Sequence, residues 1–188
     1  MSVRALDNSA QLRLVSEEVL CKGRRVALIQ RIYELDTVRF VRDVVKFGES
    51  VAVVPFINER DVILIKQFRA SVNDWVLEIP AGKVEVGEDV YEAARRELIE
   101  EIGYDAKTLV KVTSLYMSPG YSDEVLHLFV AKDLSFVGQA LEPGELLNVV
   151  VVDLDKAIKE LIESRVADVK TLLALSLMKV FGHTYLKT

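Results

Sequence analysis

The chain has 188 residues, 51% of them hydrophobic and 28% charged, which suits one well-buried core and argues against long disorder. Lysine and arginine total 24 against 29 aspartates and glutamates, and the net charge of −5 disfavours sequence-independent nucleic-acid binding, which needs a basic surface. One cysteine and two histidines exclude an intrachain disulfide framework and metal sites built from several cysteines or histidines.

No apolar run reaches the roughly 18 residues that a membrane-spanning helix needs. The residues after Met1 also lack the apolar core of a signal peptide. We therefore expect a soluble, cytoplasmic protein without a membrane or nucleic-acid partner.

The first 46 residues predict a small antiparallel β-sheet. Residues 12–15, 26–29 and 38–41 are short and rich in branched or aromatic side chains, and turn-like residues separate them. Such a sheet is too thin to hold a core by itself, so we expect residues 1–46 to pack on the rest of the chain or on a second copy. Phe47–Ser50 marks the predicted boundary with a second domain, residues 47–188.

The second domain begins with two apolar strands, over 51–56 and 62–67. A helix is predicted over 89–102, because Asp89 can cap it, Glu92 completes a capping-box pattern and Gly103 follows its last turn. Strands mixed with few helices predict an α/β or α+β layered fold. The further elements are strands near 108–117, 124–131 and 147–152 and helices near 153–164 and 168–181.

Acidic residues concentrate between Glu78 and Glu101, a stretch of 24 residues with eight acids. Glu97, Glu100 and Glu101 lie within one turn of the predicted helix and project from one face, whereas Val90, Ala94 and Leu98 recur every four residues on another. Two interpretations fit these carboxylates. They form either a solvated face balanced by Arg95 and Arg96, or a site for a hard divalent cation such as Mg²⁺, which prefers oxygen ligands.

The residues around this helix favour the second interpretation. From Gly82 the chain reads glycine, five residues, Glu88, seven residues, Arg96-Glu97-Leu98, one residue, Glu100-Glu101, one residue and Gly103. This spacing resembles the signature of the Nudix hydrolases, with Tyr104 departing from the preferred aliphatic residue. The resemblance implies an α/β/α sandwich with a mixed sheet, and hydrolysis of nucleoside diphosphates linked to another group with Mg²⁺ or Mn²⁺.

The same resemblance implies roles for individual residues. Glu97 and Glu101 would be the main metal ligands, assisted by Glu100 and by the backbone carbonyl of Ala81. Arg96 would orient the acidic cluster. Glu88 is either its partner in this task or a residue of the loop structure only.

Residues outside the signature resemble the ADP-ribose pyrophosphatase branch. They are Lys66–Arg69, Leu77–Gly82 and Ser118–Glu124, with Pro119 sixteen residues after Gly103. Related sugar-nucleotide hydrolases share several of these markers.

The branch markers contain candidate substrate-binding residues. Arg69 carries a planar fork that matches phosphate oxygens, or else it is a surface arginine. Glu78 would accept a hydrogen bond from a ribose or adenine donor, or else pair with Arg69. Ser118 and Gly120 would shape the pocket rim through backbone groups.

Hydrolysis also needs a deprotonated water, and neither histidine lies near a recognised motif, so a carboxylate or the metal must activate it. The resemblance implies a glutamate on a loop after the signature. Residues 141–146 match this place, with Glu145 the first candidate, Glu142 the second and Glu124 the third.

The resemblance further implies a homodimer, because members of this branch swap the N-terminal sheet between subunits and hold the adenine there. Arg25 and Arg42 fall where aromatic rings would stack in that branch. An arginine plane can also stack on a base, so both are candidate substrate-binding residues.

Together these features predict a divalent-metal-dependent hydrolase that splits ADP-ribose into AMP and ribose 5-phosphate. The alternative within the class is hydrolysis of another nucleoside diphosphate sugar, such as GDP-mannose. A noncatalytic nucleotide-binding module is the third hypothesis, which the retained glutamates of the signature disfavour.

Overall fold

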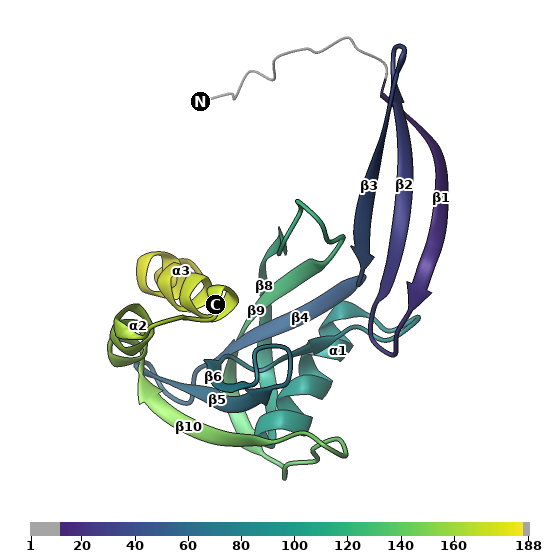
Figure 1. Ribbon diagram of the computed structural model, residues 1–188. Helices are drawn as coiled ribbons and strands as arrows, with labels where there is room; N and C mark the ends of the chain where they lie inside the picture. Colours follow the sequence, from purple (N-terminus) through teal and green to yellow (C-terminus); the bar gives the residue numbers. More distant parts are fainter. Residues whose placement is uncertain (1–11, 186–188) are drawn as a thin grey trace. The chain divides into compact units, whose positions relative to one another are not determined.

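The computed structural model describes residues 12–185 (Figure 1). Contacts within the chain divide them into two compact units. The first comprises the residues up to Phe47 with Ser118–Glu124, and the second comprises Gly48–Met117 with Val125 onward. Residues 1–11 of the predicted N-terminal segment and residues 186–188 lie outside the described part.

The first unit is built on the predicted small antiparallel sheet, which is confirmed. Its strands follow the order β1-β2-β3. A tight turn joins β2 to β3, in which Asp36 adopts a left-handed backbone conformation with φ of 54°. The strands are longer than predicted: β1 (Leu12–Lys22), β2 (Ala27–Leu35) and β3 (Val38–Lys46).

The loop Ser118–Glu124 belongs to this unit because its backbone bonds to the end of β3. The Val45 N–H donates to the Tyr121 carbonyl at 2.7 Å. The Phe47 N–H donates to an Asp123 carboxylate oxygen, also at 2.7 Å.

The second unit contains two sheets and the helices. The order in one sheet is β10-β5-β6, and all its pairs are antiparallel. The order in the other is β7-β4-β9-β8, with β4 and β9 parallel. The strands are β4 (Glu49–Pro55), β5 (Asp61–Arg69), β6 (Asp74–Glu78), β7 (Ala81–Lys83), β8 (Tyr104–Tyr116), β9 (Val125–Phe136) and β10 (Leu147–Asp153). The helices are α1 (Val90–Glu97), η1 (Leu98–Ile102), α2 (Leu154–Glu163) and α3 (Val169–Tyr185).

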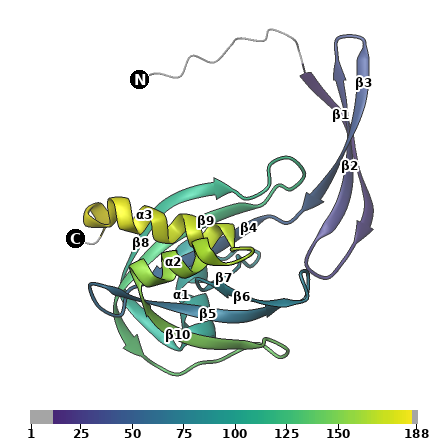
Figure 2. The same cartoon turned by 60° about the vertical axis from the view of Figure 1, so that its left-hand side comes forward.

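Alternation along the strands separates two hydrophobic cores, one on each side of the sheets. On β4, Ala52 packs in the core shared with α2 and α3, and Val53 packs in the core shared with α1 and η1. Leu64 and Ile65 of β5 divide in the same way. Helices therefore cover both sides of the strands (Figure 2), and the predicted α/β/α sandwich with a mixed sheet is confirmed.

Three details differ from the sequence prediction. The helix predicted over 89–102 is α-helical only to Glu97, and its last turn is a π-helix. Strands β6 and β7 were not predicted, because both are short and flank the irregular Ile79-Pro80. β8 begins at Tyr104 rather than near residue 108. Among the helices of residues 12–185, none has the length and apolar character needed to cross a bilayer.

Candidate active site

The acidic helix is fixed by its cap and by its apolar face. Asp89 begins α1 by accepting a hydrogen bond from the Tyr91 N–H at 2.8 Å. Ala94 and Leu98 are completely buried in the core beside β4 and β5. Gly103 ends η1 in the left-handed conformation, as predicted, with φ of 77°.

Two glutamates of this helix are buried beside β7. Glu97 is 8% exposed and Glu101 only 1% exposed. The Ala81 N–H donates to a Glu101 carboxylate oxygen at 2.9 Å. A Cβ atom on Gly82 would lie 1.9 Å from a Glu97 carboxylate oxygen, so a larger residue there would require the Glu97 side chain to move.

Burial keeps the two carboxylates from ionising easily. It raises the pKa of Glu97 to about 7, although the Arg96 guanidinium opposes the shift. Burial together with the charge of Glu97 raises the pKa of Glu101 to about 8. Two like charges held in a low-dielectric site repel each other, and a bound cation would relieve both the repulsion and the desolvation.

Arg96 links three glutamates of the signature to one another. Its guanidinium donates to Glu88 at 2.8 and 3.0 Å, to Glu97 at 2.7 Å and to Glu100 at 2.9 Å. It also donates to the Lys83 carbonyl at 3.0 Å, which attaches the loop to the helix. Arg96 thus contacts Glu88, as one of the two interpretations required, and its role as an orienting residue stays a prediction.

The donor chemistry fits a hard divalent cation. Glu97, Glu100 and Glu101 supply only oxygen atoms, and among the described residues no cationic side chain forms an ion pair with both buried carboxylates. Within residues 12–185, no three metal-ligating side chains already converge on one point. Arg96 donates to one oxygen of Glu97 and to one oxygen of Glu100, so the second oxygen of each carboxylate can still bind a metal.

A second charged group lies next to the acidic helix. Arg69 of β5 donates two parallel hydrogen bonds to Glu78 of β6, at 2.7 and 2.9 Å. The charges of Arg69 and Glu101 act on each other's pKa. Lys170 of α3 donates to the same Glu78 carboxylate. Sequence reasoning missed Lys170, because nothing local to the first turn of α3 marks it.

Among the candidate bases, Glu145 acts electrostatically on both buried carboxylates. Its charge contributes to raising the pKa of both Glu97 and Glu101. Glu142 is exposed, and its N–H donates to Glu145 at 3.1 Å in the turn before β10. Glu124 belongs to the first unit.

The other predicted substrate-binding residues also belong to the first unit. The Ser118 carbonyl accepts hydrogen bonds from two N–H groups of its own loop, and Gly120 is exposed at the turn. The Arg42 guanidinium lies 4.7 Å from the centre of the Phe40 ring. Roles for these residues and for Arg25 remain predictions.

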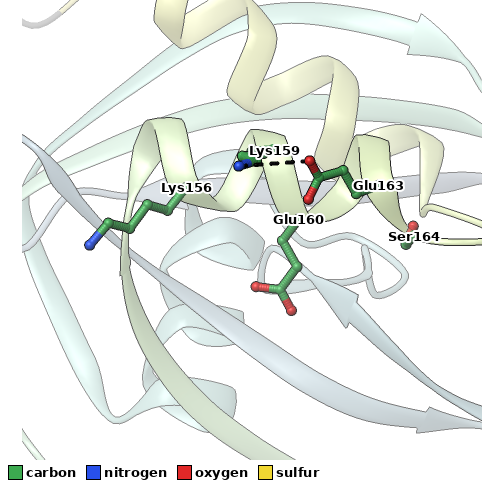
Figure 3. A pocket seen from close by; sticks show the side chains of 5 residues that line it. All are labelled: Lys156, Lys159, Glu160, Glu163 and Ser164. Atoms are coloured by element: carbon green, nitrogen blue, oxygen red, sulfur yellow. Dashed lines mark ion pairs between the residues drawn. The ribbon is translucent and has the colours of Figure 1, made fainter.

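A separate hollow of about 480 Å³ lies along α2 (Figure 3). It offers no comparable chemistry, because two lysines and two glutamates balance each other and all are exposed. Moreover, α2 packs on the opposite core from α1. Its lining residues are Lys156, Lys159, Glu160, Glu163 and Ser164.

Comparison with known proteins gives a family for this arrangement. A family model described as the NUDIX domain matches residues 46–174, which include the acidic helix, Arg69, Glu145 and Lys170. The chain belongs to the Nudix hydrolase family. The predicted superfamily and the prediction of an enzyme are therefore confirmed.

Relatives of this Nudix hydrolase span nearly its whole length. It is 38% identical over 176 residues to the ADP-ribose pyrophosphatase of Bacillus subtilis, which covers 92% of this chain and 95% of that protein. It is 30% identical to the GDP-mannose pyrophosphatase of Cronobacter sakazakii, over 93% of this chain and 98% of that protein. A crystal structure of an ADP compounds hydrolase superposes with a TM-score of 0.81 and 26% identity, over 97% and 98% of the two chains.

Proposed function

We propose that this Nudix hydrolase splits ADP-ribose into AMP and ribose 5-phosphate with the aid of Mg²⁺ or Mn²⁺. One observation carries the proposal: the buried carboxylate of Glu101, which lies beside that of Glu97, is within electrostatic reach of the Arg69 guanidinium. A diphosphate needs both kinds of group. Carboxylates hold the metal that neutralises its charge, and a guanidinium matches its oxygens. Similarity to an ADP-ribose pyrophosphatase over nearly the whole chain supports the choice of substrate.

Different residues of the site would have different roles in this reaction. Glu97, Glu101 and Glu100, with the Ala81 carbonyl, would hold the metal, which when bound polarises the phosphoryl oxygens. Arg69 would bind the diphosphate, using N–H groups beyond the two that it gives to Glu78. Arg96 would keep Glu97 and Glu100 in place through its hydrogen bonds to one oxygen of each.

Glu145 would act as the general base. It would accept a proton from water while the water oxygen bonds to one phosphorus, and the bond from that phosphorus to the bridging oxygen breaks. The two products are AMP and ribose 5-phosphate. The effect of Glu145 on both buried carboxylates supports this choice over Glu142, which lies exposed one turn away.

A single substitution tests the metal site. Glu101→Gln keeps the size of the side chain and its bond from Ala81 but removes the charge, so we expect hydrolysis of ADP-ribose to fall by roughly 10²–10³-fold. Release of AMP is measured by chromatography, and circular dichroism checks the fold. Glu92→Gln, on the exposed side of the same helix, is the control. A near-wild-type rate for Glu101→Gln would contradict the assignment.

GDP-mannose is the second candidate substrate, because the similarity to a GDP-mannose pyrophosphatase also spans nearly the whole chain. A panel of ADP and GDP sugars, compared by kcat/KM with Mg²⁺ and with Mn²⁺, decides between them. We expect the highest kcat/KM for ADP-ribose. A preference for the guanine substrate would overturn that choice.

We also propose that the enzyme is a homodimer joined through the sheet β1-β2-β3, where Arg25 and Arg42 would contact the base of the substrate. Exposed apolar side chains on this sheet support the dimer, among them Leu14, Val19 and Val41. Water would otherwise cover a large part of its apolar surface.

A further inference from the structure

A buried carboxylate in the second unit is shared by two cations from different elements. Glu78 is 2% exposed. One of its oxygens accepts from Arg69 Nε at 2.7 Å, and the other accepts from Arg69 Nη2 at 2.9 Å and from Lys170 Nζ. Lys170 reaches it from α3, 92 residues further along the chain, and is itself only 13% exposed.

Lys170 is held on its other side by Asp168, at 3.0 Å. The second oxygen of Asp168 is occupied by Thr171, whose N–H and hydroxyl donate to it at 2.9 and 2.6 Å. The ammonium group therefore has a fixed place between Asp168 and Glu78. A mobile surface lysine would not be fixed in this way.

This arrangement fixes the orientation of Arg69. The Glu78 carboxylate receives donors from both cations, and the guanidinium bound to it by two parallel bonds keeps one orientation. Glu78 and Asp168 together balance the charges of Arg69 and Lys170, so what Lys170 supplies to Arg69 is orientation rather than extra positive charge.

The same turn of α3 also fixes the backbone that leads to the acidic helix. The Ile79 N–H donates to the Thr171 hydroxyl at 2.9 Å. Two residues later, the Ala81 N–H donates to Glu101. The first turn of α3 thus holds both the Glu78 side chain and the adjoining backbone.

We propose that Lys170 is a positioning residue for diphosphate binding, acting through Glu78 to hold Arg69 oriented toward the substrate. The inference rests on the proposed function of the site. Its competitor is a purely structural role, in which Lys170 only ties α3 to the sheets and contributes to stability.

The test compares kinetics with stability in three variants. Lys170→Met removes the charge and Lys170→Arg keeps it. As a matched control on the same helix as Lys170, Lys179→Met removes an exposed ion pair with Asp155 of α2. For Lys170→Met we expect KM for ADP-ribose with Mg²⁺ to rise about 10-fold while kcat changes less than about threefold. Lys170→Arg restores most of the KM, and Lys179→Met leaves KM unchanged.

Two further measurements test whether Lys170 affects substrate binding through Arg69. The rise in Tm caused by Mg²⁺ alone should be the same in Lys170→Met as in the wild type, because Glu97 and Glu101 are untouched. A double variant Arg69→Ala/Lys170→Met should bind ADP-ribose no more weakly than Arg69→Ala, because Lys170 has nothing left to orient. Additive losses, or a lost response to Mg²⁺, would overturn the inference.

The outcomes separate the two proposals. If the wild type hydrolyses ADP-ribose and Lys170→Met lowers Tm with an unchanged KM, only the role of Lys170 is wrong. If the wild type hydrolyses no nucleoside diphosphate sugar, the proposed function is wrong, and so is the inference that rests on it. If Lys170→Met does not fold, Lys170→Gln takes its place in each measurement, with the same result expected.

Discussion

Glu101 must be charged to bind a metal, yet its burial disfavours the charged form. Its folded pKa of about 8 lies above the ordinary value of 4.5 because it is buried beside Glu97. A raised folded pKa means that the native state binds more protons than the unfolded state between these two values. Stability without metal is therefore lost as the pH rises from about 4.5 to about 8.

Removal of this charge should stabilise the metal-free protein. In EDTA at pH 8 we expect Glu101→Gln to raise the Tm above that of the wild type, and at pH 5 we expect the two to differ little. Thermal unfolding followed by fluorescence measures the effect, with Glu92→Gln as the exposed control. A lower Tm for Glu101→Gln than for the wild type at pH 8 would show that burial of the charged carboxylate does not destabilise the protein.

At the scale of the element, the end of the acidic helix depends on one glycine. η1 winds with the wider π-type turn after Glu97, a feature that often occurs at functional sites and that here keeps Glu101 on the same buried side. Gly103 then reverses the chain into β8. A Cβ atom there would lie 2.9 Å from the Gln139 nitrogen and 2.9 Å from the Phe136 ring.

Gly103 and Gly87 have similar backbone conformations but different surroundings. Their alanine variants therefore separate the cost of backbone strain from the cost of steric contact. Gly103 and Gly87 have φ of 77° and 85°, but a Cβ on Gly87 meets nothing within 4 Å. We expect Gly87→Ala to cost about 1–2 kcal/mol of unfolding free energy, the usual penalty of a left-handed L-residue. Gly103→Ala should cost clearly more, as measured by urea denaturation. Equal losses of unfolding free energy in the two variants would mean that the atoms around Gly103 shift easily to make room for the added Cβ.

At the scale of the whole molecule, the N-terminal sheet should decide the oligomeric state. Val41 is 47% exposed on β3, and Val166 is 83% exposed in the connection between α2 and α3. If β1-β2-β3 forms the dimer interface, Val41→Lys should shift the protein toward monomer and Val166→Lys should not. Sedimentation velocity over a range of concentrations gives the masses. A monomeric wild type would refute the proposed dimer.

The amino-acid sequence by itself determined the features that depend on local spacing. The repeat of Val90, Ala94 and Leu98 gives one face of a helix to the core, and the placement of Glu97 and Glu101 follows from the same periodicity. Asp89 and Gly103 marked its ends for equally local reasons. The small N-terminal sheet and the family were predictable in the same way, from short strands and from residues at fixed distances along one segment.

Only the tertiary structure decided which distant residues meet. Lys170 reaches Glu78 across 92 residues, and no periodicity encodes a contact of that separation. The close contact between Gly82 and the Glu97 carboxylate becomes evident only once β7 lies beside α1. The raised pKa values of Glu97 and Glu101 likewise depend on burial. Burial is a property of the packed layers, because desolvation is set by all the atoms that surround a charge.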